Sequence, residues 1–303
     1  MAAEALVREG RASRGFHYTA PDGLRLHARV HPGARGRPPI VCLPGLTRNA
    51  RDFDALAQAL SREAGPRPMI VAFDYRGRGL SQHDRDWRNY DVRVEAADVV
   101  AGLTALGIEH GVFIGTSRGG LIIHLLAAMR PGLMKGVVLN DFGPRLEGAG
   151  LAQIRAYLER APKPKDMTEA VLIQKTANAQ AFPALGDADW ERLVRAQYVE
   201  ADGAPVPAYD PALFKTLASI DFSNPLPEFW PQFAGLAQIP VLAIRGANSK
   251  LLSAATLAEM EMRHPDIETV TVEGQGHAPL LETAGLPARI AAFLDRLERV
   301  SAI

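Results

Sequence analysis

The residue with the clearest capacity for chemistry is a serine held between glycines. Gly115-Thr116-Ser117-Arg118-Gly119 has the form G-x-S-x-G, and it lies between a strand-like apolar run at 111–114 and a helix-like run at 121–129. At a sharp strand-to-helix turn such a serine projects its hydroxyl above the sheet, and the glycines let the turn close. The pentapeptide alone is weak evidence, so its context carries the prediction that Ser117 is a nucleophile.

His277 is the histidine best placed to activate that serine. A serine hydroxyl is a poor nucleophile at its own pKa and needs a base, which needs a further group to orient it. Among the eight histidines, His277 stands in the glycine-bounded loop 274–279 after the last predicted strand. It also follows the serine in the chain, as the order serine, acid, histidine requires.

Two backbone N–H groups are expected to bind the negative charge that develops on an attacked carbonyl oxygen. One is that of Arg118, the residue after the nucleophile. The second comes from the loop 43–47, Leu-Pro-Gly-Leu-Thr, where we choose Leu46 as the donor. A plain turn is the alternative interpretation of Pro44-Gly45 taken alone.

Short apolar strands that alternate with helices must position these groups. The patterns predict strands over 24–30, 39–43, 69–73, 111–115, 134–139, 241–244 and 268–272. They predict helices over 52–63, 92–106, 121–129, 254–263 and 287–300. This alternation indicates an α/β fold with a mostly parallel central sheet flanked by helices.

The segment 143–236 interrupts that alternation. It has helical stretches at 151–160 and 190–199, several prolines and scattered aromatic residues, but no clear buried strand. We therefore predict an inserted helical cap over 143–236, with the core built from 1–142 and 237–303.

Composition narrows the classes of function. The 303 residues carry 34 Lys plus Arg and 34 Asp plus Glu, so nothing favours a nucleic-acid or membrane-surface partner. The one cysteine, Cys42, excludes an intrachain disulfide and a cysteine zinc site. No apolar run is long enough to span a membrane, and residues 1–15 lack the apolar region of a signal peptide. We expect a cytoplasmic monomer or homodimer that acts on a small-molecule substrate.

Four sequence blocks, in their order and spacing, resemble those of α/β-hydrolase-fold proteins with a helical cap. The blocks are Leu43-Pro44-Gly45-Leu46, Asp74-Tyr75-Arg76-Gly77-Arg78-Gly79-Leu80-Ser81, Gly115-Thr116-Ser117-Arg118-Gly119-Gly120 and Gly274-Gln275-Gly276-His277. The resemblance covers nearly the whole chain and implies a serine hydrolase that needs no metal or organic cofactor. It also implies that the 74–81 block is mainly a structural loop, so Arg76 and Arg78 receive no catalytic role.

The third member of the triad departs from the family pattern. Relatives usually take their acid from the loop after the strand 241–244, but here that loop has Lys250 where similar members carry an aspartate. Some relatives place the acid one strand earlier, where this chain has Asp141, and we assign Asp141 as the orienting acid. Alternatively, Asp141 only fixes the start of the cap, and Asn248 orients a neutral His277.

Substrate contacts are expected from two regions. Arg48 and Asn49 follow the oxyanion loop and are predicted to reach the pocket. From the cap we select Tyr157, Trp190 and Trp230, although cap aromatic residues also serve as cap core.

The predicted reaction is hydrolysis of a carboxylic ester or related acyl compound through Ser117, His277 and Asp141. One alternative is a C–C bond hydrolase that uses the same serine and histidine. A second is a receptor-like ligand-binding protein with little turnover, which Lys250 in the acid loop supports. Dehalogenases and epoxide hydrolases are disfavoured because these relatives carry aspartate at the position of Ser117.

Overall fold

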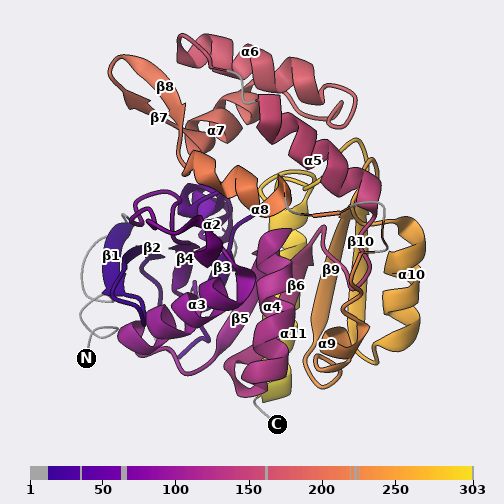
Figure 1. Ribbon diagram of the computed structural model, residues 1–303. Helices are drawn as coiled ribbons and strands as arrows, with labels where there is room; N and C mark the ends of the chain where they lie inside the picture. The colour runs from indigo at the N-terminus through magenta and orange to yellow at the C-terminus, as the bar shows by residue number, and fades with distance from the viewer. Residues whose placement is uncertain are drawn as a thin grey trace.

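The computed structural model describes residues 13–34, 36–62, 67–160, 163–218, 220, 221, 224 and 226–301. Residues 1–12, which form most of the charged N-terminal stretch noted above, lie outside this part of the chain. Figure 1 shows helices against both faces of a central sheet, with a further layer of helices and a hairpin across one end of it.

The central sheet of the described chain has eight strands in the order β1-β2-β4-β3-β5-β6-β9-β10. These are β1 (Arg14–Thr19), β2 (Arg25–His31), β3 (Ile40–Leu43), β4 (Ile70–Asp74), β5 (Gly111–Thr116), β6 (Met134–Asn140), β9 (Val241–Gly246) and β10 (Ile267–Val272). Strand β2 is antiparallel to both of its neighbours, and all other pairs are parallel. The predicted mostly parallel sheet is therefore confirmed.

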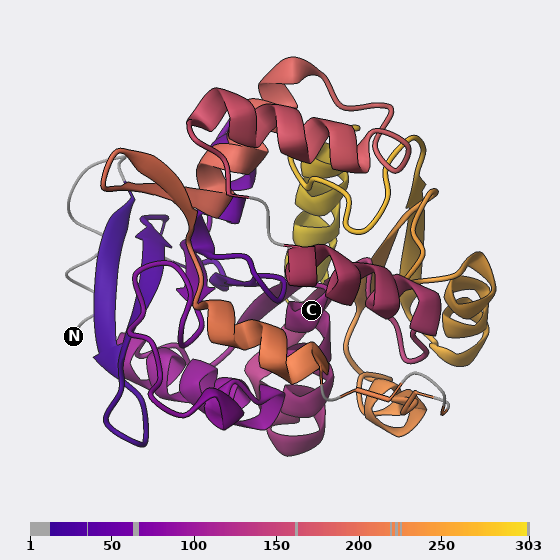
Figure 2. The ribbon, with the colours of Figure 1, turned by 45° about the horizontal axis from the view of Figure 1, so that its top comes forward.

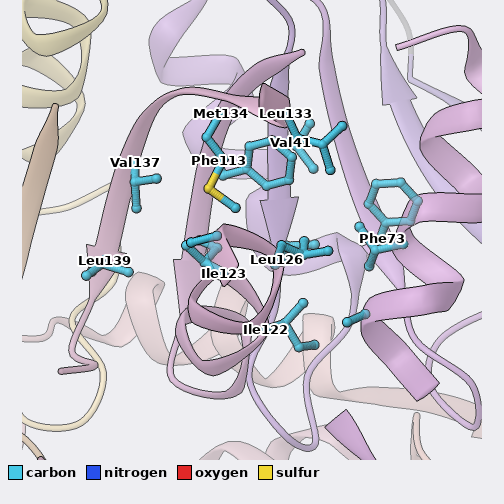
Figure 3. Packing of buried hydrophobic residues seen from close by; sticks show 14 of the residues in the cluster. Val41, Phe73, Phe113, Ile122, Ile123, Leu126, Leu133, Met134, Val137 and Leu139 are labelled. Carbon is cyan, nitrogen blue, oxygen red and sulfur yellow. The ribbon is translucent and has the colours of Figure 1, made fainter. Parts of the chain in front are cut away.

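Side chains alternate across the sheet and form an apolar core on each face. In β3, for example, Ile40 and Cys42 belong to one core cluster, and Val41 and Leu43 belong to the other. Figure 3 shows the cluster that contains Val41, in which side chains from strands and from a helix pack together. Burial of each large apolar side chain contributes on the order of 1.5–3 kcal/mol to folding.

Helices cover both clusters, as the alternation of elements predicts. The cluster that contains Val41 packs under α3 (Val92–Leu106), α4 (Arg118–Met129) and α10 (Ala254–Arg263). The opposite cluster packs under the 3₁₀ turn η1 (Ala50–Phe53), α2 (Asp54–Leu60) and α11 (Leu286–Ser301). Within the described residues, no helix is long and apolar enough to cross a membrane.

Helix α4 starts unusually close to the sheet. A Cβ built on Gly119 would lie 2.1 Å from the Leu43 carbonyl oxygen, and one on Gly115 would lie 2.6 Å from the Gly119 carbonyl carbon. Only glycine permits this approach, and it brings the first turn of α4 against the ends of β3 and β5. The close contact explains why the helix begins at Arg118 rather than at the more apolar Leu121.

The inserted segment packs over the end of the sheet where the parallel strands finish (Figure 2). It contains α5 (Gly148–Arg160), α6 (Met167–Asn178), α7 (Asp187–Gln197), the hairpin β7 (Tyr198–Ala201) and β8 (Ala204–Pro207), the turn η4 (Pro211–Leu213) and α8 (Phe214–Ala218). The hairpin was not predicted, because its strands are mostly exposed and lack a continuous apolar run.

The packing also differs from the predicted cap boundary at residue 236. Helix α9 (Trp230–Ala234) packs on α4, and Trp230, Phe233 and Leu236 belong to the sheet's own apolar core. The chain therefore rejoins the apolar core of the sheet by α9.

Because α4 lies so close to β3, we predict that one added methyl group at Gly119 destabilises the fold. Gly119→Ala forces a Cβ against the Leu43 carbonyl, so we expect the free energy of unfolding to fall by about 1–3 kcal/mol. Gly132→Ala is the matched control, because nothing lies within 4 Å of its added Cβ. Urea denaturation of the three proteins measures this, and equal midpoints for both variants would contradict the packing argument.

Candidate active site

Ser117 occupies a strained turn at the end of β5. Its backbone has φ 51° and ψ −110°, a left-handed conformation that a non-glycine residue rarely adopts. Such a conformation costs on the order of 1–3 kcal/mol and persists only where the surroundings enforce it. Here the Ser117 N–H donates to the Asn140 carbonyl at 3.0 Å, and the glycines described above let β5 and α4 meet.

His277 lies between Ser117 and Asp141. Its Nε2 is 2.9 Å from Ser117 Oγ, and its Nδ1 is 2.7 Å from Asp141 Oδ2. The carboxylate accepts only, so Nδ1 carries the proton and Nε2 is free to accept from the serine hydroxyl. The structure thus brings together the three residues that the sequence assigned to one site, from segments far apart in the chain.

Asp141 follows β6 directly and is fully buried. Its Oδ1 accepts from the Gly246 N–H at 2.8 Å, and its Oδ2 accepts from Ser249 Oγ at 2.5 Å in addition to the histidine. The Ser249 hydroxyl itself accepts from the N–H groups of Leu251 and Leu252. The loop that lacks the usual acid therefore supplies a hydroxyl donor to the acid on the neighbouring strand.

In the described chain, Asn248, the alternative orienting group, forms no hydrogen bond with His277. Its Nδ2 donates to the Ala181 carbonyl of the inserted segment at 3.1 Å, and Lys250 is exposed. Sequence analysis did not identify Ser249, although a hydroxyl beside the missing acid was a usable signal.

The two N–H groups predicted as oxyanion donors are available. In the described chain, neither the Leu46 nor the Arg118 N–H donates to another protein group. The loop before Leu46 is held from behind, since Tyr75 Oη donates to the Pro44 carbonyl at 3.2 Å and Arg78 Nε donates to the Leu46 carbonyl at 2.9 Å. Both N–H groups lie beside the serine turn, and their assignment as donors stays a prediction.

A buried carboxylate connects these two loops. Glu95 on α3 is fully buried and accepts from Arg78 Nη1 and Arg118 Nε, each at 2.6 Å. Burial alone would raise the pKa of Glu95, but the guanidinium groups of Arg118 and Arg78 outweigh it and hold that pKa below its ordinary value. The sequence held a signal for this network, because Glu95 is a charged residue among the apolar residues of the predicted helix 92–106.

A cavity of about 1010 Å³ opens over Ser117 and His277. Arg48, Tyr157 and Trp190 line it, as the sequence predicted. Burial raises the pKa of Tyr157 to about 12. Trp190 is almost fully buried, lines the cavity and packs edge-on against Phe182.

Two predicted substrate contacts are corrected by the structure. Asn49 does not line the cavity: it is buried, donates from Nδ2 to the Ala196 carbonyl at 2.7 Å and accepts from Arg51, so its polar groups are already used. Trp230 is also absent from the cavity lining. It packs on α4 in the core, and the Arg263 guanidinium lies 4.1 Å from its ring centroid.

No group of three or more His, Cys, Asp or Glu side chains in the described ranges is arranged to hold a metal ion. The cavity also lacks a glycine-rich phosphate loop at a helix start, since the turn before α4 presents the serine itself.

A protein-family model described as the alpha/beta hydrolase family matches residues 40–292. The chain belongs to the alpha/beta hydrolase family. The resemblance inferred from the four sequence blocks is thereby confirmed, as is the fold class.

Known hydrolases of this family cover nearly the same length. A 3-hydroxybutyrate-oligomer hydrolase of Cupriavidus necator is 33% identical over 285 residues, which is 90% of this chain and 92% of that protein. A 2-(acetamidomethylene)succinate hydrolase of Mesorhizobium japonicum is 30% identical over 242 residues, 79% of this chain and 81% of that protein. The crystal structure of an alpha/beta hydrolase from Novosphingobium aromaticivorans has a TM-score of 0.85 at 35% identity, covering 95% of this chain and 100% of that one.

The Glu95 network predicts a large stability effect. Glu95→Gln leaves two buried guanidinium groups without their shared charge, so we expect a loss of about 3–5 kcal/mol in the free energy of unfolding at pH 7. Glu228→Gln is the control, because its partner Arg145 is solvent-exposed and the loss should stay below about 1 kcal/mol.

The difference in free energy of unfolding between the parent and Glu95→Gln should depend on pH. The folded-state pKa of Glu95 lies below the ordinary value of 4.5, so its stabilising contribution is complete above that pH and is lost as the pH falls through the folded value. The deficit of Glu95→Gln should therefore narrow in acid. Denaturant titrations from pH 7 to pH 3 measure it, and a deficit that is constant with pH would contradict the charge assignment.

Proposed function

We propose that the protein is a serine hydrolase of carboxylic esters that works through an acyl-enzyme. The observation that carries this proposal is the continuous hydrogen-bonded chain from Ser117 Oγ to His277 and on to the Asp141 carboxylate, at 2.9 and 2.7 Å. Heavy-atom distances in this range are what general-base activation of a serine requires.

In the first half-reaction Ser117 Oγ attacks the ester carbonyl carbon while its proton passes to His277 Nε2. The negative charge moves to the carbonyl oxygen, where the N–H groups of Leu46 and Arg118 stabilise it. The buried Asp141 carboxylate stabilises the imidazolium ring. Collapse of the tetrahedral intermediate breaks the bond to the alcohol oxygen, which takes the proton from His277, and leaves the acyl group on Ser117.

In the second half-reaction His277 takes a proton from water, and the resulting hydroxide equivalent attacks the acyl carbon. The Ser117 Oγ bond to that carbon breaks, and the proton returns from His277 to the serine. The acid is released, and no cofactor takes part in the proposed sequence.

The relatives support an ester substrate of intermediate size. One relative at 33% identity is named for hydrolysis of 3-hydroxybutyrate oligomers, which are joined by ester bonds. A cavity of about 1010 Å³ is at the upper end of the range for small-molecule sites and accommodates an acyl group larger than acetyl. We take short oligoesters of 3-hydroxyalkanoates as the proposed substrate class.

The hypothesis of a receptor-like protein with little turnover rested on Lys250, which stands where similar proteins have the acid. Asp141 after the neighbouring strand β6 hydrogen-bonds His277 instead, which weakens that hypothesis. The C–C bond hydrolase alternative uses the same serine and histidine, and it stays a prediction.

The direct test is removal of the nucleophile and of the acid. Ser117→Ala should abolish hydrolysis of p-nitrophenyl esters and of the 3-hydroxybutyrate dimer, and Asp141→Asn should lower kcat by about 10⁴-fold because the imidazolium loses its counter-charge. Steady-state kinetics measure both, and a fluorophosphonate adduct on Ser117 in the parent identifies the nucleophile. Retention of a tenth of the parent activity by Ser117→Ala would refute the proposal.

Ser249 offers a graded test of the relocated acid. Ser249→Ala removes one donor to Asp141 Oδ2 and leaves the carboxylate in place, so we expect kcat to fall by about tenfold. Ser253→Ala is the matched control in the same loop: its hydroxyl only caps α10, so it should lose about 1 kcal/mol of stability and keep the parent kcat. A kcat for Ser249→Ala equal to that of the control would show that Ser249 does not position Asp141.

A further inference from the structure

The cavity above Ser117 carries an excess of positive charge. Six basic side chains line it, against three carboxylates. The basic residues are Arg48, Arg51, Arg192, Arg195, Arg245 and Lys250. A concave site with low-dielectric walls and one sign of charge attracts ligands of the opposite sign.

Each carboxylate of the lining is already engaged. Asp52 accepts from Arg48 Nε and Nη2 at 2.6 and 2.8 Å. Asp54 pairs with Arg29 at 2.7 Å, outside the cavity lining. Glu282 lies 3.9 Å from Arg192. Among the described residues, no carboxylate forms an ion pair with the remaining basic groups of the lining, Arg51, Arg195, Arg245 and Lys250.

Arg51 differs from the other unpaired cations of the lining. Arg195 and Lys250 are exposed, so water solvates their charges. The Arg245 guanidinium donates to the carbonyls of Leu252 and Ala247, which commits it to its own loop. Arg51 is partly buried in the turn η1, which contacts helix α7, so water compensates its charge less well.

Two hydrogen bonds fix the Arg51 side chain. Its Nε donates to Asn49 Oδ1 and its Nη2 donates to the Tyr198 carbonyl, both at 3.2 Å. Asn49 is itself held by Ala196, so the anchor spans the core loop and the cap. Within the described chain Nη1 has no hydrogen-bond partner and no carboxylate forms an ion pair with the group. One part of the guanidinium fork is thus pre-organised and open.

The charges around Arg51 compensate its guanidinium only in part. Burial lowers the pKa of Arg51, and the nearby carboxylates of Asp74, Asp52 and Asp54 only partly offset this. Each of them is bound to another cation, or in the case of Asp74 to His27 and the Ala50 N–H. Arginine keeps its charge under such conditions, and a half-buried guanidinium is best compensated by a carboxylate.

We infer that Arg51 is the recognition residue for a free carboxylate of the substrate, so that the enzyme prefers acyl esters that end in a carboxylate over neutral ones. This deepens the proposed function and rests on it: a 3-hydroxyalkanoate oligoester has one free carboxylate end. Ser117 reacts with an ester bond of that chain while Arg51, in the same cavity, holds the anionic end. Arg51 is a specificity residue and takes no part in proton transfer.

The test compares one scissile ester with and without the charge. The substrates are the 3-hydroxybutyrate dimer as its free acid and the same dimer capped as a neutral carboxamide. The parent should show a higher kcat/KM for the acid, and Arg51→Gln should lower the acid-to-amide ratio by about tenfold or more, the worth of a charge-assisted hydrogen bond. Arg51→Lys keeps a cation without the fork and should retain part of the ratio. Arg195→Gln, which removes an exposed cation elsewhere in the cavity lining, should change the ratio by less than about twofold.

The outcomes separate specificity from structure and from the proposed reaction. If Arg51→Gln lowers kcat/KM equally for the acid and the amide, Arg51 only connects the cap to the core, and the inference is overturned. An active parent that does not distinguish acid from amide overturns it as well, while the proposed function stands. If the parent hydrolyses neither dimer, calorimetric titration of 3-hydroxybutyrate into Ser117→Ala and into Ser117→Ala with Arg51→Gln decides. If 3-hydroxybutyrate binds to Ser117→Ala and Arg51→Gln removes this binding, the carboxylate site is supported. If it binds equally to both proteins or to neither, the inference is overturned.

Discussion

Glu95 lies between two guanidinium groups in a fully buried position, and the loops on both sides of Ser117 depend on these three charges staying together. Arg78 binds the Leu46 carbonyl of one loop, and Arg118 is the first residue of the helix that follows the serine. Loss of the Glu95 charge would leave both guanidinium groups without compensation, which is costly enough to hold the three side chains together. The positions of the predicted oxyanion donors therefore follow from an ion network on α3, a helix that does not itself reach the cavity.

A second constraint is the close approach of α4 to the sheet. Gly119 lies against the Leu43 carbonyl, and Ser117 takes a left-handed conformation so that the chain can turn from β5 into the helix. The strain is borne by the packing of α4 on β3 and β5. The same turn orients the serine hydroxyl toward His277, so the fold supplies a conformation that the local sequence would not adopt alone.

The acid Asp141 shows that either of two neighbouring strands can supply the carboxylate that orients His277. Strands β6 and β9 are parallel neighbours, so Asp141 after β6 and the loop after β9 lie at the same edge of the sheet. The carboxylate comes from one strand, and the other contributes the Gly246 N–H and the Ser249 hydroxyl that hold it. A histidine at this edge is reached from either strand, which is the physical reason that Lys250 does not break the site. The inserted segment also contacts this region, since the Tyr198 carbonyl at the junction between α7 and β7 accepts a hydrogen bond from Arg51.

Local signals in the sequence determined the alternating elements, the serine turn and the histidine loop, because apolar periodicity and glycine placement act over a few residues. The mostly parallel sheet, the helices on both of its faces and the helix 92–106 agree with those patterns. What the sequence left open were contacts between distant segments: the partner of His277, the roles of Glu95 and Ser249, and which polar side chains face the cavity. Asn49 and Trp230 have residue types suited to binding, yet tertiary packing uses one as a buried bridge to Ala196 and the other as core. Residue type and spacing show what a side chain can do, but burial and partners from elsewhere in the chain decide what it is free to do.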